Sequence, residues 1–344
     1  MQSSSASPER IIDPVTGFSY PAPWIAACRD DAGLGLVRAG LAVLTSSGTV
    51  LRRGYTTGTT AAASCKAAIL SLKEETTEVS VLTPAGIRVC IPVEAARGVA
   101  SCMKYPGDYP GDVTAGICFL AECTPAGEGI TLYPGEGIGR FTRDTPRNRK
   151  GDPAISTPAL SAILNAVQEG LEVTGLPGAS IHLRIPEGAA VARGTLNPKL
   201  GIEGGISVLG TTGLVEPWDD HLTETVMERV RTTHRVVLTT GRTGLRYARL
   251  LFPDYEAVLA GAQLKAALGE ARGPVILCGL PALILKFLDP EILSRTGCET
   301  IEEFSTRPEF RARMLLAFKK GKEKYPGLRV VIVNRDGDIL GDSG

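Results

Sequence analysis

A Thr- and Gly-rich loop, RRGYTTGTT at residues 52–60, runs directly into an Ala-rich segment and could bind an anion. The start of a helix presents free N–H groups and the positive end of the helix dipole, which suit a carboxylate or a phosphate. Threonine hydroxyls add hydrogen-bond donors, and two arginines supply positive charge. Capping of the helix is an equally good interpretation of the same residues. The loop lacks the Gly-Lys-Ser/Thr ending of a nucleoside-triphosphate P-loop, which disfavours a kinase or an ATPase.

A second Gly-rich stretch, GTLNPKLGIEGGISVLGTTGLVEP, occupies residues 194–217. Its glycines flank one short apolar strand on both sides. Glycine lets a backbone pass close to another group, so this pattern indicates close approach to a large flat ligand. A tight crossover between two domains is the alternative. The tripeptide T-T-G occurs at residues 56–58, 211–213 and 239–241, and we expect each copy to open a helix.

Two acidic turns, YPGDYPGDVTAG and YPGEGIGRFTRD, carry the carboxylates Asp108, Asp112 and Glu136. Paired carboxylates can act as general acid and base, or they can simply form Asx turns. Their spacing by itself favours the turns. A basic run follows, with one offsetting residue, Asp144, and it is either a solvated loop or a counter-surface for an acidic ligand; it consists of Arg140, Arg143, Arg147, Arg149 and Lys150.

A strand, a Gly-x-x-Gly turn and a helix start follow one another in VVLTTGRTGLRYA, residues 236–248. This order is typical of the first unit of a nucleotide-binding α/β domain. The pattern falls short of G-x-G-x-x-G, and no acidic residue ends the next strand to hold a ribose. A nicotinamide-dependent dehydrogenase is therefore disfavoured.

Composition narrows the class of protein. The 344 residues carry 37 Lys+Arg and 37 Asp+Glu, so the zero net charge argues against a nucleic-acid binder. The eight cysteines include no C-x-x-C pair and the three histidines are scattered, so we expect buried reduced thiols and no metal site. The chain shows neither a secretory signal nor an apolar run long enough for a membrane span. We expect a cytoplasmic protein.

The patterning predicts two domains after a turn-rich lead-in at residues 1–50, of which residues 1–10 are Ser-rich and expected to be disordered. Residues 51–217 read as an α+β domain, with a helix at 61–72 capped by Thr59 or Thr60. The other elements expected in this domain are a hairpin at 78–93, strands at 117–123, 130–133 and 180–186, and a helix at 158–171.

Residues 218–344 alternate strictly between helices and strands, which predicts an α/β, Rossmann-like domain with a parallel sheet. The expected helices are 219–233, 245–252, 261–271, 281–296 and 307–325. The expected strands are 235–240, 256–260, 274–279 and 328–334.

Several sequence motifs of this chain resemble those of the CbiD family, the cobalt-precorrin-5B C(1)-methyltransferases of anaerobic cobalamin biosynthesis. The resemblance covers about residues 50–220 in the family's order, and the opening DPVTGFSYP is similar to archaeal members. It rests on RRGYTTGTTAAA (52–63), VLTPAG (81–86), PGDYPGDVTAG (106–116), GEGIGRFTR (135–143), GDPAI (151–155) and LNPKLGIEGGISVLGTTGLVEP (196–217).

The resemblance implies transfer of the S-adenosylmethionine methyl group to C-1 of a cobalt-containing, ring-contracted tetrapyrrole, giving cobalt-precorrin-6A. The cobalt would arrive as part of the substrate. The many acetate and propionate carboxylates of that substrate suit helix N-termini and arginines. Because the nucleophile is an electron-rich ring carbon, no activated side chain is required, and catalysis would consist mainly of alignment and exclusion of water.

Roles for individual residues follow from that substrate. We expect substrate contacts from Arg53, Thr56, Thr57, Gly58, Thr59, Arg140, Asn197, Gly204, Gly205, Thr211 and Thr212. We expect the S-adenosylmethionine side to include Gly210, Gly213, Glu216, Gly241 and Gly244, with residues 218–344 as its domain. Asp108, Asp112 and Glu136 are the groups that we expect either to transfer a proton or to hold the charge of the sulfonium.

The chain departs from the family pattern at three places. Thr60 and Ala115 stand where the family usually has Cys and His. The segment at 279–304 keeps Lys286 but lacks the family's Thr-His. Two alternatives therefore stay open: a paralogue that methylates another modified tetrapyrrole, and a non-catalytic tetrapyrrole-binding protein. Neighbouring pathway enzymes and further copies of the chain are partners that the sequence leaves open.

Overall fold

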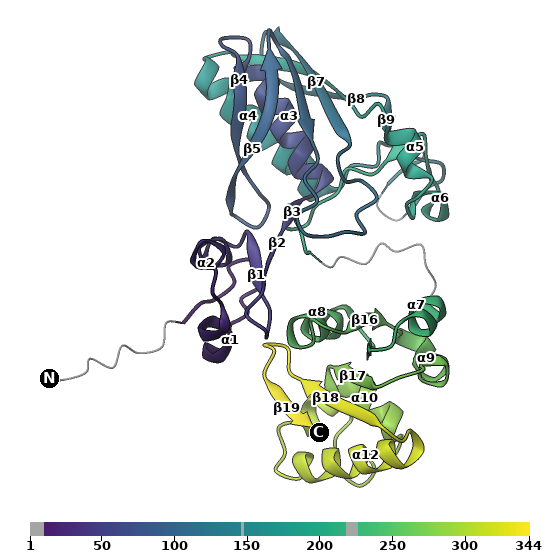
Figure 1. Ribbon diagram of the computed structural model, residues 1–344. Coiled ribbons are helices and arrows are strands. Elements are labelled where there is room, and N and C mark those ends of the chain that lie inside the picture. Colours follow the sequence, from purple (N-terminus) through teal and green to yellow (C-terminus); the bar gives the residue numbers. More distant parts are fainter. Residues whose placement is uncertain (1–9, 146–147, 218–225) are drawn as a thin grey trace, which may run out of the picture. The chain divides into compact units, whose positions relative to one another are not determined.

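A computed structural model describes residues 10–145, 148–217 and 226–344 of the chain, and it is a mixed α/β structure (Figure 1). The chain forms two compact units. Of the described residues, 39–43 and 51–217 make up one, which we call the six-strand unit. The other, the five-strand unit, contains residues 10–38, 44–50 and 226–344. Residues 1–9, which make up most of the expected disorder at 1–10, and residues 219–225 of the helix expected at 219–233 lie outside the described residues; the rest of that helix is α7 (Val226–Thr232).

The six-strand unit is built on one mixed sheet in the order β4-β5-β6-β7-β11-β8. All neighbours are antiparallel except β11 and β8, which run parallel, with Ile181 facing Cys123 on one side and Leu132 on the other. Side chains of the central strands alternate between buried and exposed, as expected of a sheet with one covered face. The strands are β4 (Thr76–Leu82), β5 (Arg88–Ala96), β6 (Val99–Met103), β7 (Cys118–Ala126), β8 (Gly129–Pro134) and β11 (Gly178–Arg184).

Two helices, α3 (Thr57–Leu70) and α4 (Thr157–Thr174), pack against each other and against this sheet (Figure 1). Every residue of α3 from Thr57 to Ile69 is buried. An Ala-rich sequence suits this position because small side chains let the helix approach neighbours on all sides. The one lysine on the helix, Lys66, is paired with Glu169 at 2.6 Å and donates to the carbonyl of Ser80 at 2.7 Å.

The predicted cap of α3 was wrong by about one turn. The cap is Thr56, whose hydroxyl accepts the N–H of Thr59, and not Thr59 or Thr60. The T-T-G at 56–58 does open this helix, whereas the copy at 211–213 leads into a strand, β14. Local sequence does not distinguish the two T-T-G copies, because hydrogen bonds to distant parts of the chain, described below, set the conformation of their threonines.

Four short strand pairs hold loops between residues 42 and 215 in place. They are β1 (Ala42–Leu44) with β2 (Val50–Arg52), β3 (Gly54–Tyr55) with β14 (Leu214–Val215), β9 (Gly137–Ile138) with β13 (Gly205–Ile206), and β10 (Arg140–Phe141) with β12 (Ile202–Glu203). Two short helices, α5 (Gly188–Ala192) and α6 (Asn197–Leu200), lie between β11 and β12 in the sequence. The β3–β14 pair joins the beginning of the unit to its end, and the β9–β13 and β10–β12 pairs join its middle to its end.

The five-strand unit has a sheet in the order β16-β15-β17-β18-β19. The first four strands are parallel, and β19 is antiparallel to β18. Central positions such as Val237, Leu238 and Leu277 are fully or almost fully buried, as expected of strands covered on both faces. The strands are β15 (Val236–Thr239), β16 (Glu256–Leu259), β17 (Val275–Gly279), β18 (Leu328–Val333) and β19 (Ile339–Asp342).

The helices of this unit follow the predicted alternation with local differences. They are α1 (Ala22–Ala27), α2 (Asp31–Arg38), α7 (Val226–Thr232), α8 (Arg242–Leu251), the 3₁₀ turn η1 (Gly261–Gln263), α9 (Leu264–Glu270), α10 (Pro281–Leu288), α11 (Ile301–Phe304) and α12 (Phe310–Lys324).

The helix predicted at 281–296 ends early, at Leu288, because Pro290 disfavours helical geometry at Asp289. Strands β6 and β19, together with the short helix α11, were not predicted. Each is only four or five residues long, too short for a clear periodicity.

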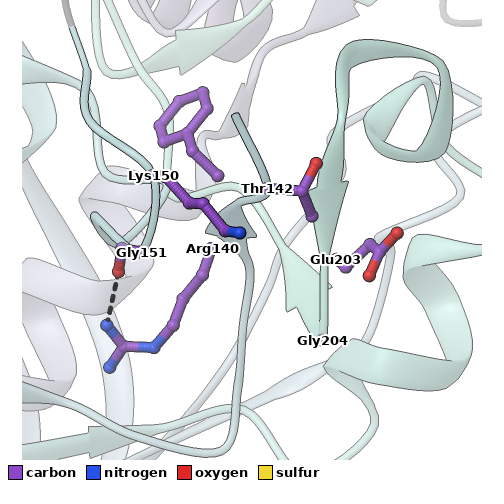
Figure 2. A pocket seen from close by; sticks show the side chains of 7 residues that line it. Arg140, Thr142, Lys150, Gly151, Glu203 and Gly204 are labelled. Carbon is purple, nitrogen blue, oxygen red and sulfur yellow. Dashed lines mark hydrogen bonds between the residues drawn. The ribbon is translucent and has the colours of Figure 1, made fainter. Parts of the chain in front are cut away.

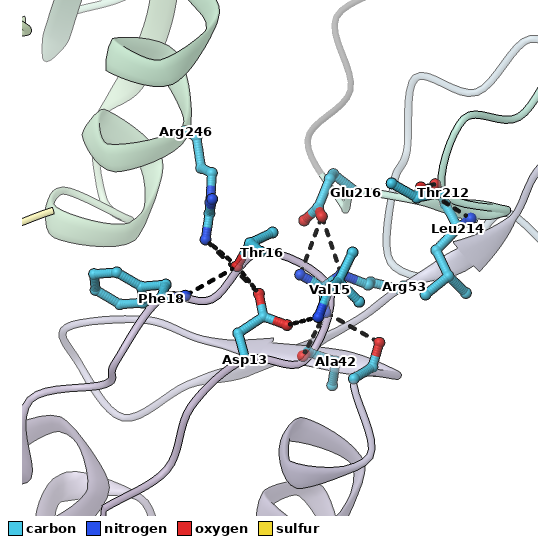
Figure 3. A network of polar contacts seen from close by, with 11 residues as sticks. Asp13, Val15, Thr16, Phe18, Ala42, Arg53, Thr212, Leu214, Glu216 and Arg246 are labelled. Atoms are coloured by element: carbon cyan, nitrogen blue, oxygen red, sulfur yellow. Dashed lines mark hydrogen bonds and ion pairs between the residues drawn. The ribbon is translucent and has the colours of Figure 1, made fainter. Parts of the chain in front are cut away.

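The N-terminal segment is fastened to α8 within the five-strand unit. Asp13 is fully buried, and Figure 3 shows the Arg246 side chain reaching Asp13 and Thr16. The Arg246 nitrogen lies 3.7 Å from the Asp13 carboxylate. The guanidinium also lies over the rings of Phe18 and Tyr247, at 5.8 and 5.4 Å from their centroids. The DPVTGF motif therefore has a structural role in this unit.

Replacing Asp13 by Ala should destabilise the five-strand unit by about 2–4 kcal/mol, because the Arg246 cation would lose a buried partner. Urea unfolding followed by the fluorescence of Trp24 checks this, since Trp24 packs 5.8 Å from Phe18. A Trp218→Phe background removes the second tryptophan signal. The exposed Glu323→Gln is the control, and equal midpoints for Asp13→Ala and this control would contradict the assignment.

Candidate functional site

The Thr-rich loop at the start of α3 packs against the Gly-rich segment at 205–215. Thr57 donates its hydroxyl to the carbonyl of Ser207 at 3.1 Å and accepts the N–H of Leu209 at 2.8 Å. The Thr59 hydroxyl donates to the carbonyl of Gly213 at 2.7 Å. Both side chains are buried. The structure thus brings these predicted residues together, and the two hydroxyls bind the protein's own backbone.

The glycines of these two segments allow that close contact. A Cβ placed on Gly58 would lie 2.7 Å from the Cβ of Ala159, and one on Gly210 would lie 2.4 Å from the hydroxyl of Thr56. Gly213 has a φ of +81° and would clash with Pro84 at 2.7 Å. These contacts account for Gly58, Gly210 and Gly213 by close packing within the six-strand unit, which is neither the flat ligand nor the crossover between domains that the sequence suggested.

Thr211 and Thr212 differ in their surroundings. Thr212 exchanges hydrogen bonds with the backbone of Leu214, and its carbonyl accepts the N–H of Ala85 at 3.0 Å. Thr211 is exposed, and its hydroxyl makes no hydrogen bond to the described part of the chain. Of the pair, Thr211 has the hydroxyl that faces outward.

Arg53 and Glu216 form one ion pair. The side chain of Arg53 is fully buried, and its nitrogens lie 3.1 and 3.0 Å from one Glu216 oxygen (Figure 3). Arg53 also donates to the carbonyl of Gly40 at 3.0 Å. This guanidinium faces the protein interior, so it holds the β3–β14 region together and does not present itself to a ligand.

Asn197 and Gly205 are likewise buried. The Asn197 amide donates to the carbonyl of Gly205 and accepts the hydroxyl of Ser207, each at 3.0 Å. A Cβ on Gly205 would lie 2.0 Å from the carbonyl oxygen of Gly137, so this glycine permits the β9–β13 pairing. Asn197 and Gly205 therefore stabilise the Gly-rich segment at 205–215, against which the threonine loop packs.

The three candidate carboxylates have different environments. Asp108 is exposed and accepts the N–H of Arg52 at 2.7 Å. Asp112 has a side chain only 9% exposed, is paired with Lys104, and accepts the N–H of Thr114 at 2.9 Å, which is an Asx turn. Glu136 is exposed, and its carboxylate contacts no hydrogen-bond partner within the described ranges. The three do not form a single acid–base pair.

The pKa of Asp112 is lowered from its ordinary value. Burial alone would raise it, but the charge and hydrogen bond of Lys104 and the two bonds from Thr114 outweigh the burial. An ionised, paired carboxylate at this position stabilises the turn at 108–116.

Asp112→Asn should cost about 3–5 kcal/mol of stability at neutral pH, because the buried Lys104 would lose the opposite charge of the carboxylate. A group whose folded pKa is depressed contributes stability above its unfolded pKa, and this is lost as pH falls through the folded value. The difference from wild type should therefore shrink below about pH 4. Urea unfolding across pH 7 to 3 measures it.

Asp108→Asn is the matched control, because an amide oxygen can still accept from Arg52. We expect it to cost less than Asp112→Asn. An Asp112→Asn protein as stable as Asp108→Asn at pH 7 would contradict the ion-pair role.

A shallow depression of about 580 Å³ lies at the β10–β12 pair. Figure 2 shows its lining, with the Lys150 ammonium between Arg140 and Thr142 in the view. Arg140 and Gly204 were predicted site residues, and Lys150 belonged to the basic run. Thr142 and Glu203 were missed, because only strand pairing places 140–142 beside 202–204. The lining residues are Arg140, Phe141, Thr142, Lys150, Gly151, Glu203 and Gly204.

Gly241 and Gly244 lie in the other unit, at the carboxyl end of β15. Gly241 is the N-terminal cap of α8, and a Cβ there would meet nothing within 4 Å. A Cβ on Gly244 would lie 3.0 Å from the Cα of Gly279, which ends β17. Gly244 therefore lets the helix start pack on the strand ends, while Gly241 leaves open space beside it.

The cysteines are all free, and five of the eight are buried. Burial raises the pKa of Cys102 and of Cys278 to about 12, so these thiols stay protonated. Across residues 10–145, 148–217 and 226–344, no three His, Cys, Asp or Glu side chains gather as metal ligands would. None of the helices in these ranges has the length and apolar character to cross a bilayer.

Comparison with known proteins gives the family. The model of the CbiD family matches residues 44–217, half of the chain. The chain belongs to the CbiD family. The match covers the loop, the Gly-rich segment, the acidic turns and the depression described above.

Relatives cover nearly the whole chain. CbiD proteins named cobalt-precorrin-5B C(1)-methyltransferase, from Methanoregula boonei and Methanospirillum hungatei, are 59% and 57% identical over 96% of this chain and 99% of their own length. A crystal structure of a cobalamin biosynthesis protein (cbiD) from Archaeoglobus fulgidus matches with a TM-score of 0.56 and 36% identity, covering 94% of this chain and 100% of that one.

Proposed function

We propose that this protein transfers the methyl group of S-adenosylmethionine to C-1 of cobalt-precorrin-5B and releases cobalt-precorrin-6A and S-adenosylhomocysteine. One observation carries the proposal: identity of 57–59% to relatives of that name extends over 96% of the chain. The matched length includes the segment at 279–304 that departs from the general family pattern. A different tetrapyrrole substrate, or binding without chemistry, has no comparable support.

The two units suit different ligands. The six-strand unit contains all but the first seven of the family's matched residues, together with the basic depression, and we assign it to the tetrapyrrole. We assign the five-strand unit to S-adenosylmethionine and interpret it as a Rossmann-like domain. The strand order β16-β15-β17-β18 supports this, because it reverses direction at β15. In open α/β sheets, ligands bind outside the carboxyl ends of the strands at such a reversal.

The residues at this edge fit an adenosyl ligand. Helices α8 and α10 both begin here, and their N-terminal N–H groups can serve the carboxylate of the methionine part. Gly241 leaves open space beside the first turn of α8, and the Gly244–Gly279 approach keeps that turn close to the sheet. Thr239 is fully buried and exchanges hydrogen bonds with Gly241, which fixes the loop.

The bound S-adenosylmethionine would supply an electrophilic methyl group on a sulfonium. The chain's own residues then have to bind the two molecules, align them and keep water out. No activated thiol is needed for this, in agreement with the raised pKa of Cys102 and Cys278. Glu136 is the one predicted carboxylate that is exposed and without a hydrogen bond to the described residues, so we assign to it any proton transfer from the tetrapyrrole.

Anaerobic incubation of the purified protein with S-adenosylmethionine and cobalt-precorrin-5B tests the reaction. We expect the tetrapyrrole to gain one methyl group by mass spectrometry, and NMR should place it at C-1. A methyl group at another carbon would support the paralogue. No gain of mass and no binding of S-adenosylmethionine would contradict an enzymatic function.

Gly241→Leu should weaken S-adenosylmethionine binding by about tenfold or more, because the side chain would occupy the open space at the start of α8. Titration calorimetry measures the affinity. Gly241→Ala is the matched control, since its φ of −160° accepts alanine and its Cβ meets nothing within 4 Å. If both variants bind as wild type does, S-adenosylmethionine does not bind at this edge.

A further inference from the structure

The depression at the β10–β12 pair carries positive charge that the protein does not neutralise. Lys150 is exposed, and its ammonium has no ion pair or hydrogen bond to the described residues. Arg140 makes no ion pair within these residues either. The buried and half-buried cations of this unit differ, because Arg53, Lys66, Lys104 and Arg184 each have a carboxylate partner. Lys150 and Arg140 therefore differ from the structural cations of the unit in having no carboxylate partner among the described residues.

The backbone fixes the guanidinium of Arg140 and the main chain of Lys150, while the Lys150 side chain itself is not bonded to the described residues. Arg140 donates to the carbonyl of Gly151 at 2.9 Å (Figure 2). It also donates to the carbonyl of Pro134 at 3.0 Å, and the two bonds fix the guanidinium and leave its other N–H groups free. The backbone N–H of Lys150 is bonded to Asp144 at 2.7 Å. Ordered main-chain positions reduce the entropy lost when a ligand binds.

The nearby carboxylates do not compete for these cations. Asp144 accepts the N–H of Lys150, and Asp152 accepts the N–H of Arg149 at 2.6 Å, so both are used by the turn. Glu203 lines the depression opposite Arg140 but forms no ion pair with either cation. In Figure 2 its carboxylate points away from them. A bound anion would therefore lie toward Lys150 and away from Glu203.

The remaining lining favours one small carboxylate. The Thr142 hydroxyl donates to the carbonyl of Gly201 at 3.0 Å, so the free donors are those of Lys150 and Arg140. Gly204, with a φ of +79° and no atom within 4 Å of a Cβ position, leaves one wall open. Two cations of this kind form strong charge-assisted bonds to a carboxylate.

We propose that Lys150 and Arg140 form a subsite for one acetate or propionate carboxylate of the tetrapyrrole substrate, with Lys150 as a residue that sets substrate affinity. This inference rests on the proposed function, because that function supplies the ligand. The subsite contributes to binding and orientation, and it takes no part in methyl transfer itself.

Steady-state kinetics of methyl transfer test the subsite. Lys150→Glu should raise KM for cobalt-precorrin-5B about tenfold, Lys150→Gln less, with kcat within about twofold of wild type. The S-adenosylmethionine affinity should not change. Lys199→Glu on α6 is the matched control, because Lys199 is exposed and lies outside the depression. An equal KM for Lys150→Glu and Lys199→Glu would overturn the subsite.

A binding assay separates this proposal from the proposed function. Uroporphyrin is a tetrapyrrole with acetate and propionate side chains, and its binding can be followed by quenching of fluorescence. We expect it to bind wild type and to bind Lys150→Glu with lower affinity. Its methyl ester should bind both proteins equally. Lys150-dependent binding without methyl transfer would keep the subsite and refute the enzymatic function. Normal methyl transfer with Lys150-independent KM and binding would refute the subsite alone.

Discussion

The first turn of α3 is held by hydrogen bonds between threonine hydroxyls and the backbone at 207–213, and the architecture of the six-strand unit depends on this contact. Each bond stabilises the fold by about 0.5–1.5 kcal/mol, and each would leave a buried polar group unpaired if lost. Thr57 and Thr59 join a segment near the start of the unit to one near its end. With α3 buried all round, this contact fixes where the Gly-rich segment, and therefore β12 and the depression, must lie.

Charge in the six-strand unit is divided between structural and free cations. Arg53, Lys66 and Lys104 are buried and paired, because an unpaired charge in the interior is costly. Lys150 lies in an open depression, where water can solvate its charge. Burial thus distinguishes Arg53, which holds strands together, from Lys150, for which we propose contact with the substrate, although both lie in polar, Gly-containing loops.

The five-strand unit uses glycine in a different way. Gly244 and Gly279 bring a helix start onto the strand ends, while Gly241 leaves space beside them. In the proposed function, the two helix N-termini and the open loop at this edge would bind the carboxylate and the adenosyl group of S-adenosylmethionine. This division of roles matches a reaction that requires alignment of two bound molecules more than an activated side chain.

The sequence by itself determined the family, the mixed α/β class, most helices and strands, and which loops are rich in glycine and threonine, because these depend on local pattern and on motif order. Only the tertiary structure decided whether each polar side chain is bonded within the protein or is available to a ligand. Thr57, Thr59, Arg53 and Asn197 have the residue types of anion ligands, yet their partners lie between about ten and 160 residues away and are internal. Hydrogen-bond capacity is visible in a sequence, but whether the protein itself satisfies it depends on long-range packing.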